Sequence, residues 1–289
     1  MIRLCAFSDE AAPSLTGQIA AMKRNGIGLT ELRSVDGVNV KDLSERTAEE
    51  IRRELDEGGI AVWAIGSPLG KVDISLPFAE YCPTVEHVMR LGRILGTKRI
   101  RIFSFFSAYD AEQIVVENLK RMVEIADRYG MILCHENEKD IFGDRPDRIL
   151  RLHEQVKGMR LVYDPANFLQ VNERAEDTLP LLHGLCDYFH IKDVISADGT
   201  IVPAGEGDGR IGELIDGIAP DRDTVLTLEP HLRVFAGYGA IDGSEMKNRY
   251  AYPSNDAAFD AAATALRELL RAHGWKETKG VYEYHGSRT

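Results

Sequence analysis

The sequence predicts a single (β/α)₈ barrel of the α/β class, and three observations support this prediction. Short runs rich in β-branched residues and Leu alternate with longer helical patterns from one end of the chain to the other. Eight strand-like runs occur within 289 residues, a length that this fold often reaches as one domain. No Pro-, Gly- or Ser-rich linker divides the chain, so we expect one barrel domain over residues 1–275.

The expected strands are short and mostly apolar, as parallel strands buried on both faces tend to be. They are residues 2–7, 28–33, 61–66, 99–104, 132–136, 160–164, 187–192 and 224–229. An open, doubly wound sheet is the alternative arrangement of eight βα units. No GxGxxG follows the first strand and no GxxxxGK[ST] occurs, so the nucleotide-binding forms of that sheet are not favoured.

Amphipathic helix patterns lie between these strands. Two apolar stripes end at a glycine, as helices often do: Leu15, Ile19 and Met22 before Gly26, and Val115, Leu119, Met122 and Ala126 before Gly130. Residues 45–57 and 257–272 also predict helices. We expect the apolar faces of these helices to pack on the barrel.

Three longer stretches without a regular pattern each follow a strand, at residues 66–78, 193–222 and 230–254. Loops in this position build the active site of such barrels. Residues 203–212, PAGEGDGRIG, are rich in glycine but lack a following Lys-Ser/Thr, so we expect them to cover a substrate. Residues 276–289 are polar and predict a loosely ordered C-terminal tail.

The composition disfavours nucleic-acid-binding, membrane-spanning and disulfide-rich classes of protein. The net charge is -11, from 46 acidic and 35 basic residues, which disfavours a nucleic-acid surface. No apolar run approaches the roughly 20 residues that span a bilayer, and the N-terminus lacks a signal-peptide pattern, so we expect a cytoplasmic protein. The four cysteines, Cys5, Cys82, Cys134 and Cys186, form no CxxC, and we expect buried thiols rather than disulfides or zinc ligands.

Four consecutive strands in the second half of the chain each end in a potential metal ligand. These residues are Glu136, Asp164, His190 and Glu229. Any one of them has a simpler explanation, since a strand-end carboxylate is often a helix N-cap or a salt bridge and a lone histidine is often structural. Side chains at neighbouring strand ends of a barrel converge, however, and three clustered carboxylates would repel one another without a cation. The set therefore predicts one metal site.

The ligand types indicate which ion is expected. Three carboxylates and one imidazole offer mostly hard oxygen ligands, which suit Mn²⁺, Mg²⁺ or Co²⁺ better than a structural zinc site. We expect one divalent ion, with Mn²⁺ preferred and Mg²⁺, Co²⁺ or Zn²⁺ as alternatives.

Further polar residues lie near the same strand ends. Glu31 and Arg33 end the second strand, and a buried structural ion pair is the alternative to substrate contact for Glu31. Lys71 follows the third strand and is either an anion-binding or a solvated lysine. Lys192 alternates to the same face as His190 along the seventh strand. We include these residues and His231 as candidate substrate-binding residues.

Several short motifs resemble one known family. They are HEN at 135–137, DPAN at 164–167, HIKD at 190–193 and LEPH at 228–231, with FSDE at 7–10 and ELRSVDGVNV at 31–40. In this order they resemble the xylose isomerase-like TIM barrel superfamily, specifically its sugar phosphate isomerase/epimerase branch. The resemblance extends to about residue 272.

The resemblance implies a divalent metal held by Glu136, Asp164, His190 and Glu229, with Glu136 and Glu229 as the catalytic acid/base pair. One carboxylate would remove a proton next to a carbonyl and the other would reprotonate the opposite face, through an enediolate. Ketose 3-epimerases of this superfamily usually carry a His where this chain has Asn167 and an Arg where it has Ser196. Asn167 still offers hydrogen bonds to a substrate.

The expected function is therefore a metal-dependent sugar or sugar phosphate isomerase/epimerase acting on a small carbohydrate, in a chain that could form a homo-oligomer. The alternative is a metal-dependent dehydratase or lyase on a keto-sugar or keto-inositol-like substrate. A non-catalytic sugar-binding barrel is a further alternative. An endonuclease for abasic DNA, found in one branch of the superfamily, is disfavoured because its three-zinc site needs more histidines and the chain is acidic.

Overall fold

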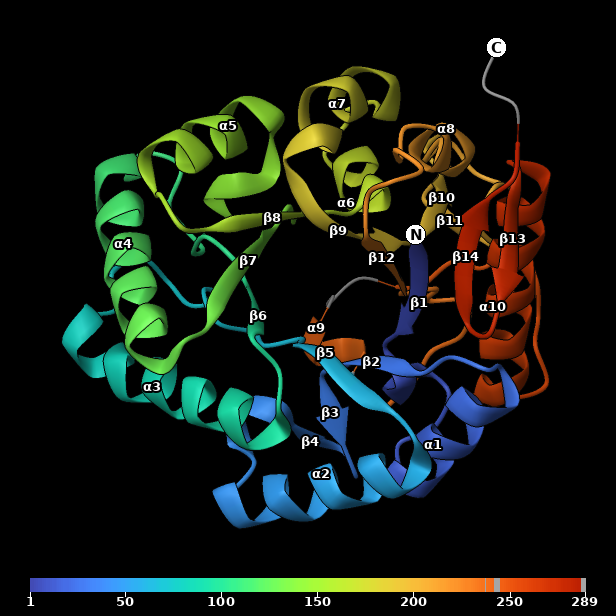
Figure 1. The fold of residues 1–289 in the computed structure, drawn as a ribbon. Helices are drawn as coiled ribbons and strands as arrows, with labels where there is room; N and C mark the ends of the chain where they lie inside the picture. The colour runs from blue at the N-terminus through green and yellow to red at the C-terminus, as the bar shows by residue number, and fades with distance from the viewer. Residues whose placement is uncertain (237, 242–244, 287–289) are drawn as a thin grey trace.

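The computed structural model describes residues 1–236, 238–241 and 245–286. Among these residues, eight parallel strands close into a barrel with helices outside it (Figure 1). The barrel strands are β1 (Ile2–Ala6), β2 (Leu29–Leu32), β5 (Ala61–Ile65), β6 (Arg99–Ile102), β7 (Ile132–Glu136), β8 (Arg160–Tyr163), β9 (Cys186–Ile191) and β12 (Thr224–Leu228). The barrel closes because β12 pairs in parallel with both β9 and β1. The predicted (β/α)₈ fold is confirmed, and each predicted strand lies within two residues of its observed bounds.

Helices follow the strands and cover the barrel (Figure 1). The longer ones are α1 (Leu15–Arg24), α2 (Glu45–Gly58), α3 (Phe78–Leu95), α4 (Glu112–Tyr129), α5 (Pro146–Gln155) and α10 (Asn255–Ala272). The shorter ones are α6 (Pro165–Gln170), α7 (Ala175–Leu182), α8 (Ile211–Asp216) and α9 (Tyr238–Ile241). The predicted helices at 45–57 and 257–272 correspond to α2 and α10, and the two apolar stripes lie in α1 and α4. None of the described helices is both long and apolar enough to cross a membrane.

The inside of the barrel has two layers. Small and aromatic side chains fill the lower layer: Cys5, Ala64, Cys134, Val162, Tyr188 and Val225. Because side chains alternate along a strand, residues two positions further on point into the same interior at the carboxyl ends. Glu136 lies two positions after Cys134 in β7, and His190 lies two positions after Tyr188 in β9. The small and aromatic side chains of the lower layer therefore pack beneath the polar side chains of Glu136 and His190.

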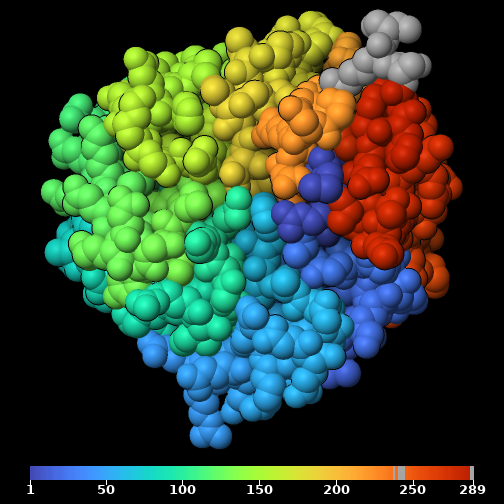
Figure 2. Space-filling model, viewed as in Figure 1, coloured from blue at the N-terminus to red at the C-terminus, as the bar shows by residue number. Residues whose placement is uncertain are grey.

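The C-terminal segment corrects one prediction. Residues 276–286 are not a loose tail, because β13 (Trp275–Thr278) and β14 (Val281–Tyr284) form an antiparallel hairpin. β14 pairs with the start of β1, where Ile2 lies opposite Tyr282. Trp275 and Tyr282 are almost fully buried, which anchors an otherwise polar segment. The N-terminal strand β1 and the C-terminal hairpin consequently lie side by side, in dark blue and red in Figure 2.

The loops after the strands contain more regular structure than expected. The stretch 193–222 holds a hairpin of β10 (Asp193–Ile195) and β11 (Thr200–Val202), followed by α8. A second hairpin of β3 (Ser34–Val35) and β4 (Val38–Asn39) follows β2. The stretch 66–78 is irregular up to the start of α3, as predicted. The stretch 230–254 contains α9, and residues 237 and 242–244 within it lie outside the described residues.

All four cysteines are free, and three of them are buried. The prediction of buried thiols is confirmed for Cys5, Cys134 and Cys186, whereas Cys82 in α3 is only partly buried. Burial raises the pKa of the Cys186 thiol to about 12. These thiols therefore pack as small apolar groups.

Candidate metal centre

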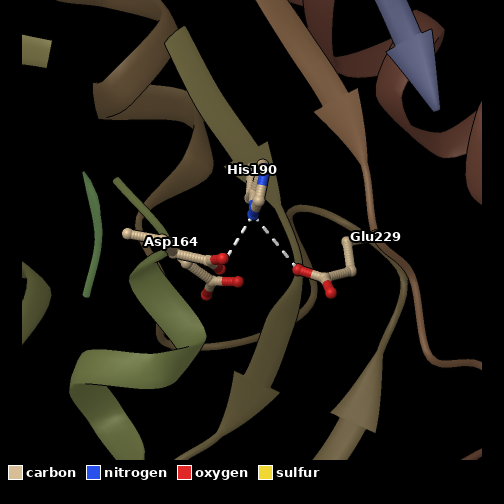
Figure 3. Close-up of side chains that lie close together, drawn as sticks. Asp164, His190 and Glu229 are labelled. Carbon is tan, nitrogen blue, oxygen red and sulfur yellow. Dashed lines mark hydrogen bonds and ion pairs between the residues drawn. The ribbon is translucent and has the colours of Figure 1, made fainter. Parts of the chain in front are cut away.

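The four predicted ligands meet at the carboxyl end of the barrel. Glu136 is the last residue of β7, Asp164 directly follows β8, His190 lies near the end of β9 and Glu229 directly follows β12. One ligand atom from each lies within 4.8 Å of the others. All four side chains are buried, and Asp164, His190 and Glu229 point toward one another from separate strands (Figure 3). These residues come together because β7, β8, β9 and β12 are consecutive strands of the barrel.

Asp164 has two roles, one for each carboxylate oxygen. Its Oδ1 accepts a hydrogen bond from the backbone N–H of Asn167 at 2.9 Å, so it caps the N-terminus of α6. Pro165 occupies the first turn of that helix, where its missing N–H costs nothing. The other oxygen, Oδ2, is left for the cluster. The helix-cap role and the ligand role are thus both compatible with the structure.

His190 is oriented by contacts at both ring nitrogens. Its Nδ1 lies 2.9 Å from Glu136 Oε1 and 3.3 Å from Glu229 Oε2. Its Nε2 lies 3.1 Å from Glu31 Oε2, on the other side of the ring. The edge of the ring also packs against Phe7, with ring centroids 5.2 Å apart. Nδ1 is consequently the nitrogen that faces the carboxylates.

The donor atoms fit a divalent cation. One oxygen on each of Glu136, Asp164 and Glu229 is buried without a well-oriented hydrogen bond among the described residues. Cationic side chains do approach these oxygens, with Arg101 Nη1 at 3.2 Å from Glu136 and Lys192 Nζ at 3.0 Å from Asp164. Buried carboxylate oxygens are ordinarily hydrogen-bonded or bound to a metal. Three carboxylates and an imidazole Nδ1 within reach of one point match an oxygen-rich metal site.

The charges of the cluster are strongly coupled. Burial alone would raise the pKa of Glu136, but His190 and Arg101 hold it below its usual value. Burial also opposes ionisation of Glu229, yet Lys192 and His190 keep its pKa well below the usual range. Burial raises the pKa of Asp164 to about 7, although Lys192 opposes this shift. Burial favours a neutral His190, but Glu136 and Glu31 raise its pKa well above the ordinary value.

A cavity of about 120 Å³ adjoins the quartet through Arg33 and Arg101, which line it and contact Glu229 and Glu136. Its lining includes Arg33, Lys71, Arg101, Asp9 and the ring of Phe103. The pocket therefore presents three cationic side chains and one carboxylate.

Arg33 is held in this wall by three carboxylates. Its guanidinium lies 2.9 Å from Asp9, 3.2 Å from Glu10 and 3.1 Å from Glu229. The same group stacks over Phe7, 4.3 Å from the ring centroid. Arg33 thus connects the cavity wall to one of the candidate metal ligands.

The other candidate residues lie around the same centre. Lys71 pairs with Glu138 at 2.8 Å, and its Nζ lies 4.4 Å from the Phe103 ring centroid. Lys192 Nζ lies 3.6 Å from Glu229. His231 Nε2 lies 3.6 Å from the same carboxylate.

Asn167 and Glu31 contact ligands rather than the cavity. Asn167 Nδ2 donates to Glu136 Oε1 at 3.3 Å, and the residue is buried. Glu31 is fully buried, and its two oxygens contact Tyr188 and His190. Both substrate contact and a buried structural ion pair were open for Glu31; its contact with His190 fits the second, and substrate contact stays a prediction.

Four further residues at the centre were not among the predicted site residues: Arg101, Asn137, Asp9 and Glu10. β6 alternates Arg and Ile, and its Arg101 is buried, so a charged residue within a short barrel strand was a usable signal. Asp9 and Glu10 belong to the FSDE motif directly after β1. Asn137 belongs to the HEN motif, but its role depends on a partner on the next strand, which sequence spacing does not reveal.

The glycine-rich stretch folds around one carboxylate. Asp193 accepts hydrogen bonds from the backbone N–H groups of Gly205, Gly207 and Gly209 at 2.9 to 3.0 Å. A Cβ at Gly207 would lie 2.3 Å from Asp193 Oδ1, so this close approach requires glycine. Ser196 donates to Asp208 at 2.6 Å and does not join the quartet. Covering of a substrate by residues 203–212 stays a prediction.

Comparison with known proteins supplies the final observation on this site. The sequence model described as a xylose isomerase-like TIM barrel matches residues 19–246. No curated protein sequence matches the chain.

Several solved structures are similar. The probable 3-DHS dehydratase AsbF, involved in petrobactin synthesis in Bacillus anthracis, shares 20% identity over 92% of this chain and 99% of its own, with a TM-score of 0.69. L-ribulose 3-epimerase shares 17% identity over 94% and 96%, with a TM-score of 0.72. The IOLI protein, solved with a zinc atom, shares 15% over 94% and 99%, with a TM-score of 0.71. At these identities the similarity establishes a common fold.

Proposed function

The chain belongs to the xylose isomerase-like TIM barrel family, and we propose that it is a divalent-metal-dependent isomerase or epimerase of a small carbohydrate. The observation that carries this proposal is the buried quartet of Glu136, Asp164, His190 and Glu229. Solved neighbours include an epimerase and a probable dehydratase, so the fold is compatible with chemistry next to a sugar carbonyl.

Glu136 and Glu229 are proposed as the acid/base pair. They come from β7 and β12, with β8 and β9 between them in the sheet, so they flank the cluster from two sides. Their pKa values lie below the usual range, for the reasons given above, so both are carboxylates at neutral pH. A carboxylate on each side of one substrate carbon can remove a proton from one face and, once protonated, return it from the other.

The proposed cofactor is one divalent ion, with Mn²⁺ preferred and Mg²⁺, Co²⁺ or Zn²⁺ as alternatives. When bound, such an ion would polarise the substrate carbonyl and stabilise the negative charge of an enediolate. Glu136, Asp164, Glu229 and His190 Nδ1 would hold it.

The remaining polar residues are proposed to bind the substrate. Arg33 and Lys71 line the cavity beside the quartet, and both have at least one carboxylate partner that fixes their position. His231 and Lys192 approach Glu229 from other directions. Asn167 contacts Glu136, so it is placed to orient that carboxylate as well as to hydrogen-bond a substrate hydroxyl. Sugar hydroxyls accept and donate hydrogen bonds, which suits this mixture of charged groups.

Elimination is the second candidate reaction, and the position of Lys192 favours it. Its ammonium lies 3.0 Å from Asp164 and 3.6 Å from Glu229, within the proposed acid/base machinery. Burial would lower the pKa of Lys192, but Asp164 and Glu229 raise it well above the ordinary value, so the group is a charged donor. An ammonium beside a base can protonate a departing hydroxyl after proton abstraction.

Solvent exchange tests the shared first step. Incubation of the metal-loaded protein with a panel of ketoses in D₂O should introduce one deuterium next to the carbonyl. Isomerisation or epimerisation leaves the product mass otherwise unchanged, whereas loss of water lowers it. The Glu136→Gln protein serves as the control and should exchange at least 100-fold more slowly. Absence of exchange across the panel with Mn²⁺, Mg²⁺ and Co²⁺ would contradict the proposal.

A further inference from the structure

Glu31 lies behind His190, on the side of the ring away from the other carboxylates. Glu31 Oε2 is 3.1 Å from His190 Nε2, and Glu31 Oε1 accepts a hydrogen bond from the Tyr188 hydroxyl at 3.0 Å. All three side chains are fully buried. The imidazole is therefore held at both nitrogens, with Nδ1 toward the quartet and Nε2 toward Glu31.

Glu31 lies beside an irregularity in the pairing of β2 with β5. Thr30 pairs with Val62 and Glu31 pairs with Ala64, so the extra residue, Trp63, is in β5. Such a bulge locally disrupts the ladder and increases the strand twist. Tyr188 and His190 are two residues apart in β9 and so share the inward face, and Trp63 packs edge-on against Tyr188 with centroids 6.1 Å apart. The chain of contacts from Tyr188 through Glu31 to His190 thus runs across the barrel interior, between β9 and β2.

We propose that Glu31 is a positioning residue that fixes the tautomer and orientation of His190 for metal binding. Imidazole binds a metal through an unprotonated nitrogen, and the hydrogen bond at the other nitrogen decides which one that is. A carboxylate at Nε2 favours the form with its proton on Nε2 and its lone pair on Nδ1. That lone pair then points at the carboxylates of Glu136 and Glu229. Tyr188 holds Glu31 in turn, by its hydroxyl. This inference rests on the proposed metal site.

Cobalt binding to the purified, chelator-stripped protein tests the proposal without any substrate. Titration calorimetry should give a weaker affinity for Co²⁺ in Glu31→Gln by about 10-fold and in Glu31→Ala by up to about 100-fold. Gln retains an oxygen that can accept the Nε2–H but lacks the charge, so the smaller loss is expected for it. Tyr188→Phe removes the hydroxyl that holds Glu31 but keeps the Glu31 carboxylate, so it should weaken binding only a few-fold.

A spectroscopic signature separates positioning from a purely structural role. In the Co²⁺-loaded wild type, the Nε2–H proton should give a paramagnetically shifted ¹H resonance that exchanges slowly with solvent. The Glu31 variants should show a displaced resonance or fast exchange. Cys134→Ala is the matched control, because Cys134 packs in the same inner layer as Tyr188 and touches neither Glu31 nor His190 by hydrogen bond. This control should lose stability but keep both the affinity and the resonance.

The outcomes distinguish a failure of the proposed Glu31 role from a failure of the proposed metal site. If the wild type binds Co²⁺ and both Glu31 variants bind it within threefold of wild type with an unchanged resonance, Glu31 has no positioning role. If Glu31→Ala does not fold, the same comparison is made with Glu31→Gln and Tyr188→Phe. If the wild type itself binds no stoichiometric Co²⁺, the proposed metal site is wrong, and the role of Glu31 is overturned with it.

Discussion

Asn137 and Asp164 form a reciprocal pair of hydrogen bonds across the ends of β7 and β8. The Asn137 side chain donates to the Asp164 backbone carbonyl at 2.8 Å and accepts from the Asp164 backbone N–H at 2.8 Å. The pair is buried. It fixes the backbone of one candidate ligand to the strand that ends in another, Glu136.

The first prediction concerns this pair. Asn137→Ala leaves a buried donor and a buried acceptor of Asp164 without a partner, so we expect the free energy of unfolding to fall by about 2–4 kcal/mol. Metal affinity should also fall, by about 10- to 100-fold, because the Asp164 carboxylate is no longer held in place. Urea denaturation and Co²⁺ titration measure the two effects. Asn118→Ala, a change at a buried asparagine in α4, should lower stability alone; equal losses of affinity in both variants would contradict the prediction.

The second prediction concerns Asp193 and the glycine-rich stretch. Asp193→Ala removes the acceptor of four backbone N–H groups, three of them in the glycine-rich stretch, so we expect a loss of about 2–4 kcal/mol in stability and a freed loop at residues 203–210. Limited proteolysis should then cleave the variant in this loop at least 10-fold faster than the wild type. Asp208→Ala, which alters the same loop at an exposed residue, should change the cleavage rate far less. Wild-type resistance of Asp193→Ala would show that other contacts hold the loop.

The third prediction is a pH dependence caused by His135. Its ring is fully buried, neither nitrogen has a hydrogen-bond partner among the described residues, and burial lowers its pKa to about 4. In the unfolded chain the pKa is near 6.5, so between pH 6.5 and 4 the unfolded state binds a proton that the folded state does not. Stability therefore falls as the pH drops through this window, by about 3 kcal/mol from this residue.

Denaturation of His135→Leu at several pH values measures this effect. The stability difference between variant and wild type should be constant above pH 6.5. Below it, the difference should shift in favour of the variant by about 1.4 kcal/mol for each pH unit. His153→Asn provides a comparison, because burial lowers the pKa of this partly buried histidine as well, with a smaller change expected. Parallel pH profiles of His135→Leu and wild type would rule out His135 as the cause.

The barrel could be predicted because its signals are local. Each strand is a short apolar run, and each cap or breaker is near in sequence. The quartet could also be predicted, since ligands at consecutive strand ends of a closed barrel must converge. The positions of Asp164 and His190 follow from their places at the ends of β8 and β9. The C-terminal hairpin could not be, because its polar sequence is ordered by pairing with β1 at the other end of the chain.

Residues whose role depends on a distant partner were equally hard to assign. Glu31 was placed near the site by its strand position, but its partner His190 lies on β9, across the barrel interior from β2. Arg101 was not predicted because it lies within β6 rather than at a strand end, and it reaches Glu136 from the neighbouring strand. Asn137 acquires its role only through Asp164. In each case the missing information is which residues of other strands lie nearby in the closed barrel, which local sequence does not encode.

Metal binding to the wild type and to two ligand variants tests the proposed site most directly. The chelator-stripped wild type should bind about one equivalent of Mn²⁺ or Co²⁺ and gain thermal stability as the metal is added, since a ligand that binds only the folded state stabilises it. Glu136→Gln and Asp164→Asn should each lose at least 100-fold in affinity and most of the stability gain. If both variants retain the metal content and the metal-dependent stability of the wild type, these residues are not its ligands and the proposed centre is wrong.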